Sequence, residues 1–253
     1  MKPTIKLIRD GYPNAPGMDI AVSRALLLRA SDGEITETFR LNIPGRVMAF
    51  GKRDTLTPGY PAAVVAAHTA GFRPVERLAG GRAAVFHEGT FAFSWTIPAS
   101  DPRSGIKSRF SLLTDLMVAA FARIGIEGEV GQVPGEYCPG DHSVHHDGRI
   151  KLMGVGQRLA RGAAHIGGVV MVTNSALARE ALIPVYEALQ LDWNPATVGA
   201  LQDIVPGLTM QSAAAAIETE LSAAASLEAV HLDETTIDLA RTLAPDHVST
   251  STS

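Results

Sequence analysis

The sequence predicts an α/β fold, with one large domain and a short helical appendage near its C-terminal end. The chain has 253 residues, which suits one large domain, and 46% of them are hydrophobic, which is enough for a sizeable core. Short apolar runs typical of strands are interspersed with longer helical patterns up to about residue 190. We therefore predict a main domain over 1–190, a helical appendage over 191–245 and a disordered Ser/Thr-rich tail over 246–253.

The N-terminal part of the chain predicts helices and strands of ordinary length. Apolar residues at Met18, Ala21, Val22, Ala25 and Leu28 share one face of a helix. Gly71 provides a stop for a second helix, because glycine readily ends a helix. The predicted elements are a strand over Ile5–Ile8, a helix over Met18–Ala30, strands over Thr36–Ile43 and Arg46–Phe50, and a helix over Pro61–Ala70.

The remainder predicts one strongly amphipathic helix and two further strands before the appendage. Apolar residues recur at helical spacing through Arg109–Ile124, and Gly125 follows them. Pro184 predicts a kink or a break in the next helix. The predicted elements are an irregular stretch over Ile126–Asp141, strands over Gly148–Gln157 and Ile166–Thr173, and helices over Asn174–Leu189, Met210–Ala225 and Asp233–Leu243.

Composition and charge exclude several classes of protein. The net charge is −4 with no basic run, so we expect no nucleic-acid partner. No apolar run is long enough for a membrane span, and the N-terminus carries no signal-peptide pattern. The single cysteine rules out an internal disulfide and fits a reducing compartment. We therefore expect a cytoplasmic protein that does not bind membranes.

One stretch, Val75–Thr96, combines a flexible backbone with two cations. Gly80 and Gly81 can adopt positive φ, and Arg77 and Arg82 flank them, so a turn here presents N–H groups to an anionic or polar ligand. Two strand-like runs follow, Ala84–His87 and Phe91–Thr96. The alternative is a β-hairpin in which the glycines only make a turn.

These residues carry a family resemblance. Arg77–Glu88 resembles the glycine-rich loop of the lipoate/octanoate protein ligase and transferase family. Glu76 stands where the family usually has Arg, and Ala79 where it usually has Ser or Thr. Arg82 is more similar to the cysteine-dependent octanoyltransferase branch than to the ATP-dependent ligases. The resemblance implies substrate-binding roles for Arg77, Gly80, Gly81, Arg82, Ala83 and His87.

A second motif, Arg149–Arg158, resembles the family's lysine motif. The resemblance gives Lys151 the role of contacting the acyl carbonyl, where an ammonium stabilises the charge that develops during acyl transfer. It also implies substrate-binding roles for Gly154, Gly156 and Gln157, and a pocket-lining position for His165. The fold implied is that of biotin/lipoate protein ligases, a mixed β-sheet packed with helices that holds the acyl chain in an apolar tunnel.

Cys138 is the only thiol and lies in a Gly/Pro-rich loop before the lysine motif. In the octanoyltransferase branch a cysteine in a similar place takes the acyl group as a thioester, and a thiolate is well suited to that exchange. A buried, unreactive cysteine is the alternative. His142, His145 and His146 follow closely, and one of them could act as a base. We predict no metal site, because a second pair of ligands is not evident.

Three hypotheses follow. The first is an acyltransferase that moves an octanoyl or lipoyl group through a Cys138 thioester, with no cofactor. Its donor is acyl carrier protein or an acylated H-type protein, and its acceptor is a lysine of a lipoyl domain of a 2-oxoacid dehydrogenase or of an H-type protein. The second is a lipoate–protein ligase that uses ATP and Mg²⁺ to form lipoyl-adenylate. The third is a non-catalytic lipoyl-binding protein of the same fold.

Overall fold

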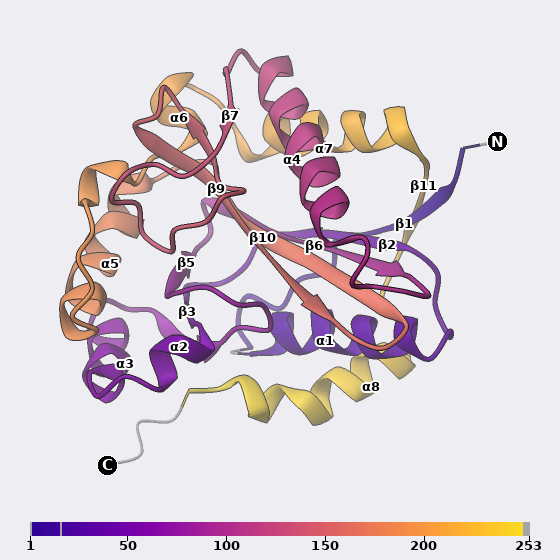
Figure 1. The fold of residues 1–253 in the computed structure, drawn as a ribbon, viewed down its shortest axis with the longest axis horizontal. Helices are drawn as coiled ribbons and strands as arrows, with labels where there is room; N and C mark the ends of the chain where they lie inside the picture. The colour runs from indigo at the N-terminus through magenta and orange to yellow at the C-terminus, as the bar shows by residue number, and fades with distance from the viewer. Residues whose placement is uncertain (1, 16, 250–253) are drawn as a thin grey trace.

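The computed structural model describes residues 2–15 and 17–249 (Figure 1). Its strands are β1 (Thr4–Ile8), β2 (Thr38–Asn42), β3 (Val47–Phe50), β4 (Arg73–Glu76), β5 (Ala84–Phe86), β6 (Thr90–Pro98), β7 (Glu129–Val130), β8 (Val144–His146), β9 (Ile150–Leu159), β10 (Ala163–Met171) and β11 (Ser226–Val230). Its helices are α1 (Met18–Ser31), α2 (Lys52–Thr55), α3 (Tyr60–Thr69), α4 (Ile106–Arg123), α5 (Ser175–Ala188), α6 (Leu201–Ile204), α7 (Met210–Ala224) and α8 (Glu234–Leu243), with 3₁₀ turns η1 (Pro195–Thr197) and η2 (Ala244–His247).

The strands form two sheets. The large sheet has eight strands in the order β11-β1-β2-β6-β10-β9-β8-β7, and the small sheet has three in the order β4-β3-β5. β1 pairs in parallel with both β11 and β2, whereas β2, β6, β10 and β9 are antiparallel neighbours. The large sheet is therefore mixed, as the resemblance implied.

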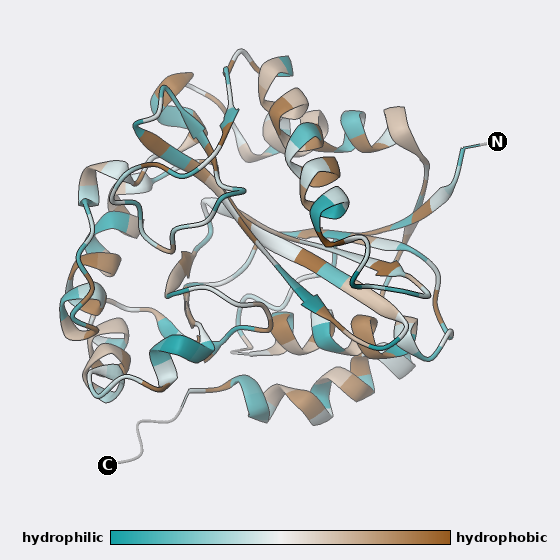
Figure 2. Ribbon diagram, in the orientation of Figure 1, coloured by the Kyte–Doolittle hydropathy of each residue, from teal (hydrophilic) through white to brown (hydrophobic). Residues whose placement is uncertain are grey.

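Helices cover the sheets in three groups (Figure 1). α4 and α7 contact each other on one side of the large sheet, whereas α1 packs on β6 and β10 on the other side and is covered by α8. α3 and α5 pack together beside the small sheet. In Figure 2 hydrophobic and hydrophilic segments alternate along α4, as expected for a helix with one face on a core. Burial of these apolar faces holds the layers together.

The predicted helices and long strands are present, with ends shifted by a few residues. One detail was wrong: Pro184 does not break its helix, because α5 continues through it from Ser175 to Ala188. The last helix is capped by Asp233, whose side chain accepts a hydrogen bond from the Thr236 N–H at 2.7 Å.

The hairpin considered for Val75–Thr96 does not form. β5 pairs with β3 in the small sheet, whereas β6 pairs with β2 and β10 in the large sheet. The chain changes sheets at Glu88-Gly89. The glycine-rich loop before β5 is therefore free to lie over the large sheet instead of closing a hairpin.

The C-terminal region contains a strand that we did not predict. β11 pairs in parallel with β1 along Thr4–Ile8 and forms one edge of the large sheet. The tail prediction was wrong for its first residues, because His247 is buried and the Ser249 N–H donates to the Pro74 carbonyl at 3.3 Å. Residues 250–253 lie outside the described residues. Within the described ranges no helix is both long and apolar enough to cross a membrane.

Candidate active site

A cleft over β9 and β10 brings together the glycine-rich loop, the cysteine loop and the lysine motif. Most of the residues expected to form the site line it. Those residues are Arg77, Gly80, Gly81, Cys138, Lys151, Gly154, Gly156 and Gln157. Loops from three separate parts of the sequence therefore meet over one patch of the large sheet.

The Cys138 thiol faces the glycine-rich loop. The backbone N–H of Arg82 donates to Sγ at 3.3 Å, and Nη1 of Arg77 lies 3.4 Å from Sγ. Cys138 itself has φ of 43°, a left-handed conformation that is uncommon outside glycine. Its N–H donates to the Tyr186 hydroxyl at 2.7 Å, and that hydroxyl donates to the Ala83 carbonyl at 2.9 Å. Cys138 is half-buried. Its unusual backbone conformation is held by Tyr186 of α5, which in turn bonds to Ala83 beside the glycine-rich loop.

Charge around the thiol favours its ionised form. Burial alone would raise the pKa of Cys138, because it disfavours a charge. The positive charges of Arg77 and Lys151 and the hydrogen bonds from Arg82 and Arg77 act in the opposite direction, and the pKa of the thiol lies below its ordinary value. A lowered pKa is characteristic of reactive cysteines rather than of structural ones.

Lys151 and Glu136 form a buried ion pair beneath the cysteine loop. The exposed fractions of the two side chains are 2% and 0%, and Nζ lies 3.3 Å from Oε1. The ammonium also donates to the carbonyl oxygens of Tyr137 at 3.1 Å and Cys138 at 2.7 Å. Its three protons are therefore all directed to the loop. Lys151 therefore holds the peptide groups on both sides of Cys138.

The Glu136 carboxylate holds the rest of the same loop. Oε1 accepts hydrogen bonds from the Ser143 hydroxyl at 2.7 Å and the Gly140 N–H at 3.0 Å, and Oε2 accepts from the Val133 N–H at 3.3 Å. Sequence reasoning missed this residue. An isolated glutamate in a Gly/Pro-rich loop gives no signal of burial, and only the position of Lys151 beneath the loop shows that the two charges neutralise each other.

Close contacts explain two glycines at the glycine-rich loop, Gly81 in the cleft and Gly51 behind it. Gly81 has φ of 119°, and a Cβ there would lie 2.9 Å from the Cys138 Sγ. A Cβ on Gly51 would lie 1.9 Å from the Gly81 carbonyl oxygen. Any side chain at either position would displace the loop from the thiol.

The Arg82 side chain points away from the thiol and toward a buried carboxylate. Its Nη1 lies 3.1 Å from Oδ1 of Asp54, and Oδ2 of Asp54 accepts a hydrogen bond from the Gly51 N–H at 2.9 Å. Burial raises the pKa of Asp54, and the bonds from Gly51 and Arg82 oppose that rise. Asp54, which sequence reasoning also missed, ties the glycine-rich loop to the end of β3. Arg82 therefore contributes its backbone N–H to the thiol and its side chain to the support of the loop.

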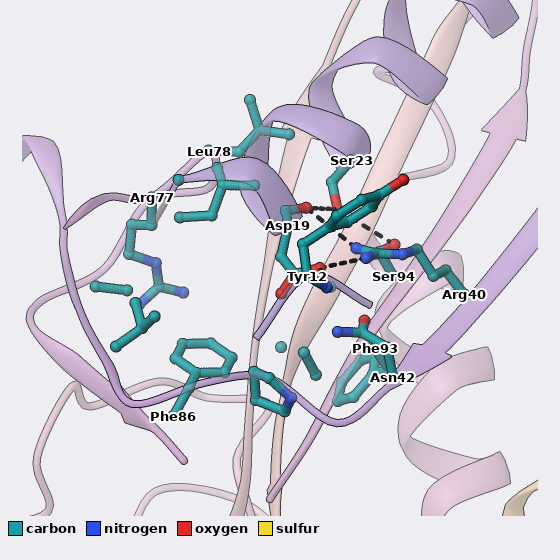
Figure 3. Close-up of a pocket in the computed structure, with 18 of the residues that line it drawn as sticks. Tyr12, Asp19, Ser23, Arg40, Asn42, Arg77, Leu78, Phe86, Phe93 and Ser94 are labelled. Carbon is teal, nitrogen blue, oxygen red and sulfur yellow. Dashed lines mark hydrogen bonds and ion pairs between the residues drawn. The ribbon is translucent and has the colours of Figure 1, made fainter. Parts of the chain in front are cut away.

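A second cavity continues from the cleft. The two share Arg77, Phe86 and Gly168 as lining residues. Figure 3 shows the second cavity, with Arg77 on one side and the Asp19–Arg40 ion pair and Asn42 on another. Leu78, Phe86 and Phe93 contribute apolar surface to its wall. The cavity can hold an elongated, largely apolar group that begins near the thiol.

Small residues form the floor of this channel. Across four neighbouring strands Gly156 pairs with Gly167, Gly167 with Ser94, and Ser94 with Arg40. Three such strand spacings extend about 14 Å. Because the residues between the two ends carry little or no side chain, a chain-like ligand can lie across the strands. The channel leads from the cysteine loop toward β2.

The remaining predicted residues occupy different places. The Gln157 Nε2 donates to the Ile106 carbonyl at 2.8 Å, and its Oε1 accepts from Arg109, so it ties β9 to the start of α4. His165 lines the second cavity, and burial lowers its pKa to about 4. His87 does not join the described lining of either cavity, because its ring is buried between the Gly89 N–H at 3.0 Å and the Met171 sulfur at 3.2 Å. Burial lowers the pKa of His87 to about 4 as well.

The three histidines after Cys138 have other partners. His142 stacks on Phe110 with ring centroids 4.2 Å apart. The His145 Nδ1 accepts a hydrogen bond from the Gly148 N–H at 3.2 Å, and the His146 Nδ1 lies 2.8 Å from the Glu127 carbonyl oxygen. Among the residues that the structure describes, no group of three or more His, Cys, Asp or Glu side chains is placed to hold a metal ion.

Comparisons with known proteins point to one family. The family model of the lipoyl protein ligase A/B catalytic domain matches residues 15–222. An octanoyl-[GcvH]:protein N-octanoyltransferase of Geobacillus kaustophilus is 29% identical over 223 residues, which cover 88% of this chain and 75% of the relative. A lipoyl-[GcvH]:protein N-lipoyltransferase of Listeria monocytogenes is 27% identical over 175 residues, which cover 63% of this chain and 61% of the relative.

Solved structures share the fold. The crystal structure of a lipoate-protein ligase A bound with ATP superposes with a TM-score of 0.78 at 17% identity, covering 97% of this chain and 95% of that one. Ta0514, a putative lipoate protein ligase from T. acidophilum, gives a TM-score of 0.76 at 17% identity, covering 99% and 97%. The predicted mixed-sheet fold is confirmed. Since the family model spans most of the sequence, the chain belongs to the lipoyl protein ligase A/B catalytic domain family.

Proposed function

We propose that this protein is an acyltransferase that carries an octanoyl or lipoyl group on Cys138 as a thioester and passes it to a protein lysine. The observation that carries the proposal is the placement of the thiol. It lies in the cleft beside Arg77, which also lines the adjoining apolar cavity, and two donors from the glycine-rich loop point at it. The names of the relatives, octanoyl- and lipoyl-[GcvH]:protein transferases, support the same reaction class.

The first half-reaction loads the enzyme. The Cys138 thiolate attacks the acyl carbonyl of the donor, forming a carbon–sulfur bond and a tetrahedral oxyanion. Collapse of that intermediate breaks the bond between the carbonyl carbon and the donor. A donor thiol leaves as a thiolate, whereas a donor lysine nitrogen takes a proton from water and leaves as the amine. The lowered pKa of the Cys138 thiol increases the share of the nucleophilic thiolate.

The second half-reaction unloads it. The neutral amine of an acceptor lysine attacks the Cys138 thioester, the carbon–sulfur bond breaks, and the amine proton is released as the amide forms. Cys138 returns as a thiolate. Neither route requires a nucleotide. A thioester donor is already activated, and with an amide donor the amide bond broken during loading is re-formed on the acceptor lysine.

The developing oxyanion needs nearby positive charge or N–H groups. We assign this role to the Arg82 N–H and the Arg77 guanidinium, which lie within 3.5 Å of Sγ. Lys151 acts from below by holding the Cys138 carbonyl and by contributing its charge. It contacts the acyl oxygen only if it gives up one of its three loop partners, so we place its positioning role first.

The proposed acceptor is the lysine of an H-type protein or of a lipoyl domain, and the proposed donor is an acylated H-type protein or acyl carrier protein. The ligase alternative requires cations for the phosphates of ATP. The Arg82 guanidinium is paired with the buried Asp54, and Glu76 occupies the position where the family's first Arg is expected. Both observations favour the transferase.

Intact-mass measurement tests the proposal. We expect wild-type protein incubated without ATP with octanoyl-loaded H-type protein or octanoyl carrier protein to gain one octanoyl group, and Cys138→Ala to gain none. Addition of an unloaded lipoyl domain then removes the adduct from the enzyme. An adduct that persists in Cys138→Ala, or transfer only with ATP and Mg²⁺, contradicts the thioester route. Absence of transfer in both conditions favours a non-catalytic lipoyl-binding protein.

A further inference from the structure

The far end of the acyl channel carries an unsatisfied polar side chain. Asn42 lies at the end of β2, lines the cavity, and is only 4% exposed. Its amide Nδ2 has no hydrogen-bond partner among the described residues. Buried amide groups in folded proteins almost always have a partner. An amide left without one in the wall of a ligand cavity indicates that the ligand supplies the partner.

The Arg40 and Asp19 charges and the two serine hydroxyls beside Asn42 are already paired. The Arg40 guanidinium donates to the Asp10 carbonyl at 2.9 Å and pairs with the Asp19 carboxylate. The Ser23 hydroxyl lies 3.4 Å from the Ser94 hydroxyl. Figure 3 shows Asp19, Arg40, Ser23 and Ser94 together and places Asn42 beside them in the cavity wall, with Arg77 away on another side. His165, which lines the same cavity from β10, also has a buried ring nitrogen, Nδ1, with no partner among the described residues. At the β2 end, Asn42 is the residue whose buried amide donor lacks a protein partner.

The sheet register places Asn42 at the distance of a chain terminus. Asn42 pairs with Ala92, Ala92 with Val169, and Val169 with Gly154. Gly154 lies beside the Lys151 side chain, since a Cβ on it would be 3.2 Å from the Lys151 Cε. Three strand spacings correspond to about 14 Å. That span is longer than an extended octanoyl chain alone, and the thioester sulfur at one end and the Asn42 side chain at the other bridge the remainder.

A plain alkyl terminus does not suit this wall. A methyl group against Asn42 would keep its N–H away from water without giving it an acceptor, which is the costly way to bury a polar group. An acceptor atom at the end of the chain removes that penalty. The dithiolane sulfurs of a lipoyl group are weak acceptors, and a terminal hydroxyl is a stronger one.

We propose that the channel selects a medium-chain acyl group with a hydrogen-bond acceptor at its far end, and that Asn42 is the specificity-determining residue. The inference rests on the proposed function for the identity of the acyl group. The preference for a chain with a terminal acceptor over a plain alkyl chain rests on Asn42 and the channel alone. Lipoyl and ω-hydroxyoctanoyl groups share the required chemistry, and octanoyl lacks it.

Two measurements test the inference. The first is binding of free lipoic, ω-hydroxyoctanoic and octanoic acids to the full chain by isothermal titration calorimetry. The second is the single-turnover rate of Cys138 acylation by carrier or H-type protein loaded with each chain. Both are made on wild type, on Asn42→Leu, which keeps the size but removes the amide, and on Asn14→Leu, an exposed position on the neighbouring loop, as the matched control.

We expect wild type to favour at least one acceptor-bearing chain over octanoyl by roughly tenfold or more, and Asn42→Leu to abolish or reverse that preference. Asn14→Leu behaves as wild type. Whether lipoyl or ω-hydroxyoctanoyl is favoured identifies the acceptor. A wild-type protein that prefers octanoyl, or a preference that Asn42→Leu leaves unchanged, overturns the inference. Selective binding of the acids without acylation of Cys138 contradicts the proposed function and leaves the channel inference standing.

Discussion

The two ends of the acyl channel differ in how their buried polar groups are satisfied. At the cysteine end, Glu136, Lys151 and the thiol each have at least two partners within the protein. At the β2 end, Asn42 has a donor with no partner among the described residues. The cysteine end is therefore organised before any ligand arrives, whereas the β2 end is completed by the ligand. Catalysis needs the former and selection of a substrate can use the latter.

The pairing at the cysteine end organises the loop more than it stabilises the fold. A buried ion pair recovers in attraction roughly what its two charges lose in hydration, so its net contribution to folding is small. The Lys151–Glu136 pair instead positions the peptide bonds around Cys138, whose left-handed backbone would otherwise relax. Substitutions made separately at the cysteine end and along the channel test this comparison.

The largest expected effect is at the nucleophile. Replacing Cys138 with Ser leaves a hydroxyl whose ionisation is negligible at neutral pH, and we expect acyl transfer to fall by about a thousandfold or more. Single-turnover transfer to a lipoyl domain measures it. The thermal unfolding midpoint, which we expect to change little, serves as the folding control. Transfer near the wild-type rate would show that Cys138 does not carry the acyl group.

Removing one charge of the buried pair has the next largest effect. Lys151→Met leaves the Glu136 carboxylate buried without its partner, and we expect the free energy of unfolding to fall by about 3–5 kcal/mol. The double variant Lys151→Met/Glu136→Gln removes both charges and recovers most of that loss. Urea denaturation of both variants and of wild type checks this. Equal destabilisation by the single and double variants would show that the pairing of charges is not what matters.

Filling the channel separates the two ends functionally. Ala92 lies on the channel floor, so Ala92→Leu blocks the acyl chain but leaves the thiol in place. We expect acylation by octanoyl or lipoyl donors to fall by roughly 10- to 100-fold, while alkylation of Cys138 by iodoacetamide is unchanged. Stopped-flow and intact-mass measurements give the two rates. A parallel loss of both rates would mean that the two ends are not independent.

The smallest expected effect is on the titration of the thiol. The pKa of Cys138 lies below its ordinary value because nearby positive charge outweighs burial. The rate of Cys138 alkylation by iodoacetamide therefore rises with pH and levels off at a lower pH than for a free thiol. Arg77→Gln removes a positive charge, so the pKa rises and the curve moves to higher pH. A curve that stays in place, with Arg103→Gln as a surface control, would exclude Arg77 as a source of the shift.

Local sequence patterns predicted most of the helices and strands. The apolar face of α4 and the buried run of β10 are strong because their periodicity does not depend on distant residues. The pattern fails where pairing is long-range. Ser226–Val230 has no distinctive local signal and becomes a strand only because β1 offers it an edge. For β5 and β6 the sequence predicted both strands but not their partners, because they are consecutive in the chain yet join different sheets.

The sequence by itself determined the chemistry available: one thiol, a lysine motif, a glycine-rich loop between two arginines, and a family resemblance that the comparisons confirm. Only the tertiary structure decided how these groups are used. It paired Lys151 with Glu136, turned the Arg82 side chain to Asp54 and its N–H to the thiol, and left the Asn42 amide facing a channel. Partners separated by tens of residues are brought together by packing and sheet register, and burial then determines which polar group needs a partner. That information is not present in any local stretch of sequence.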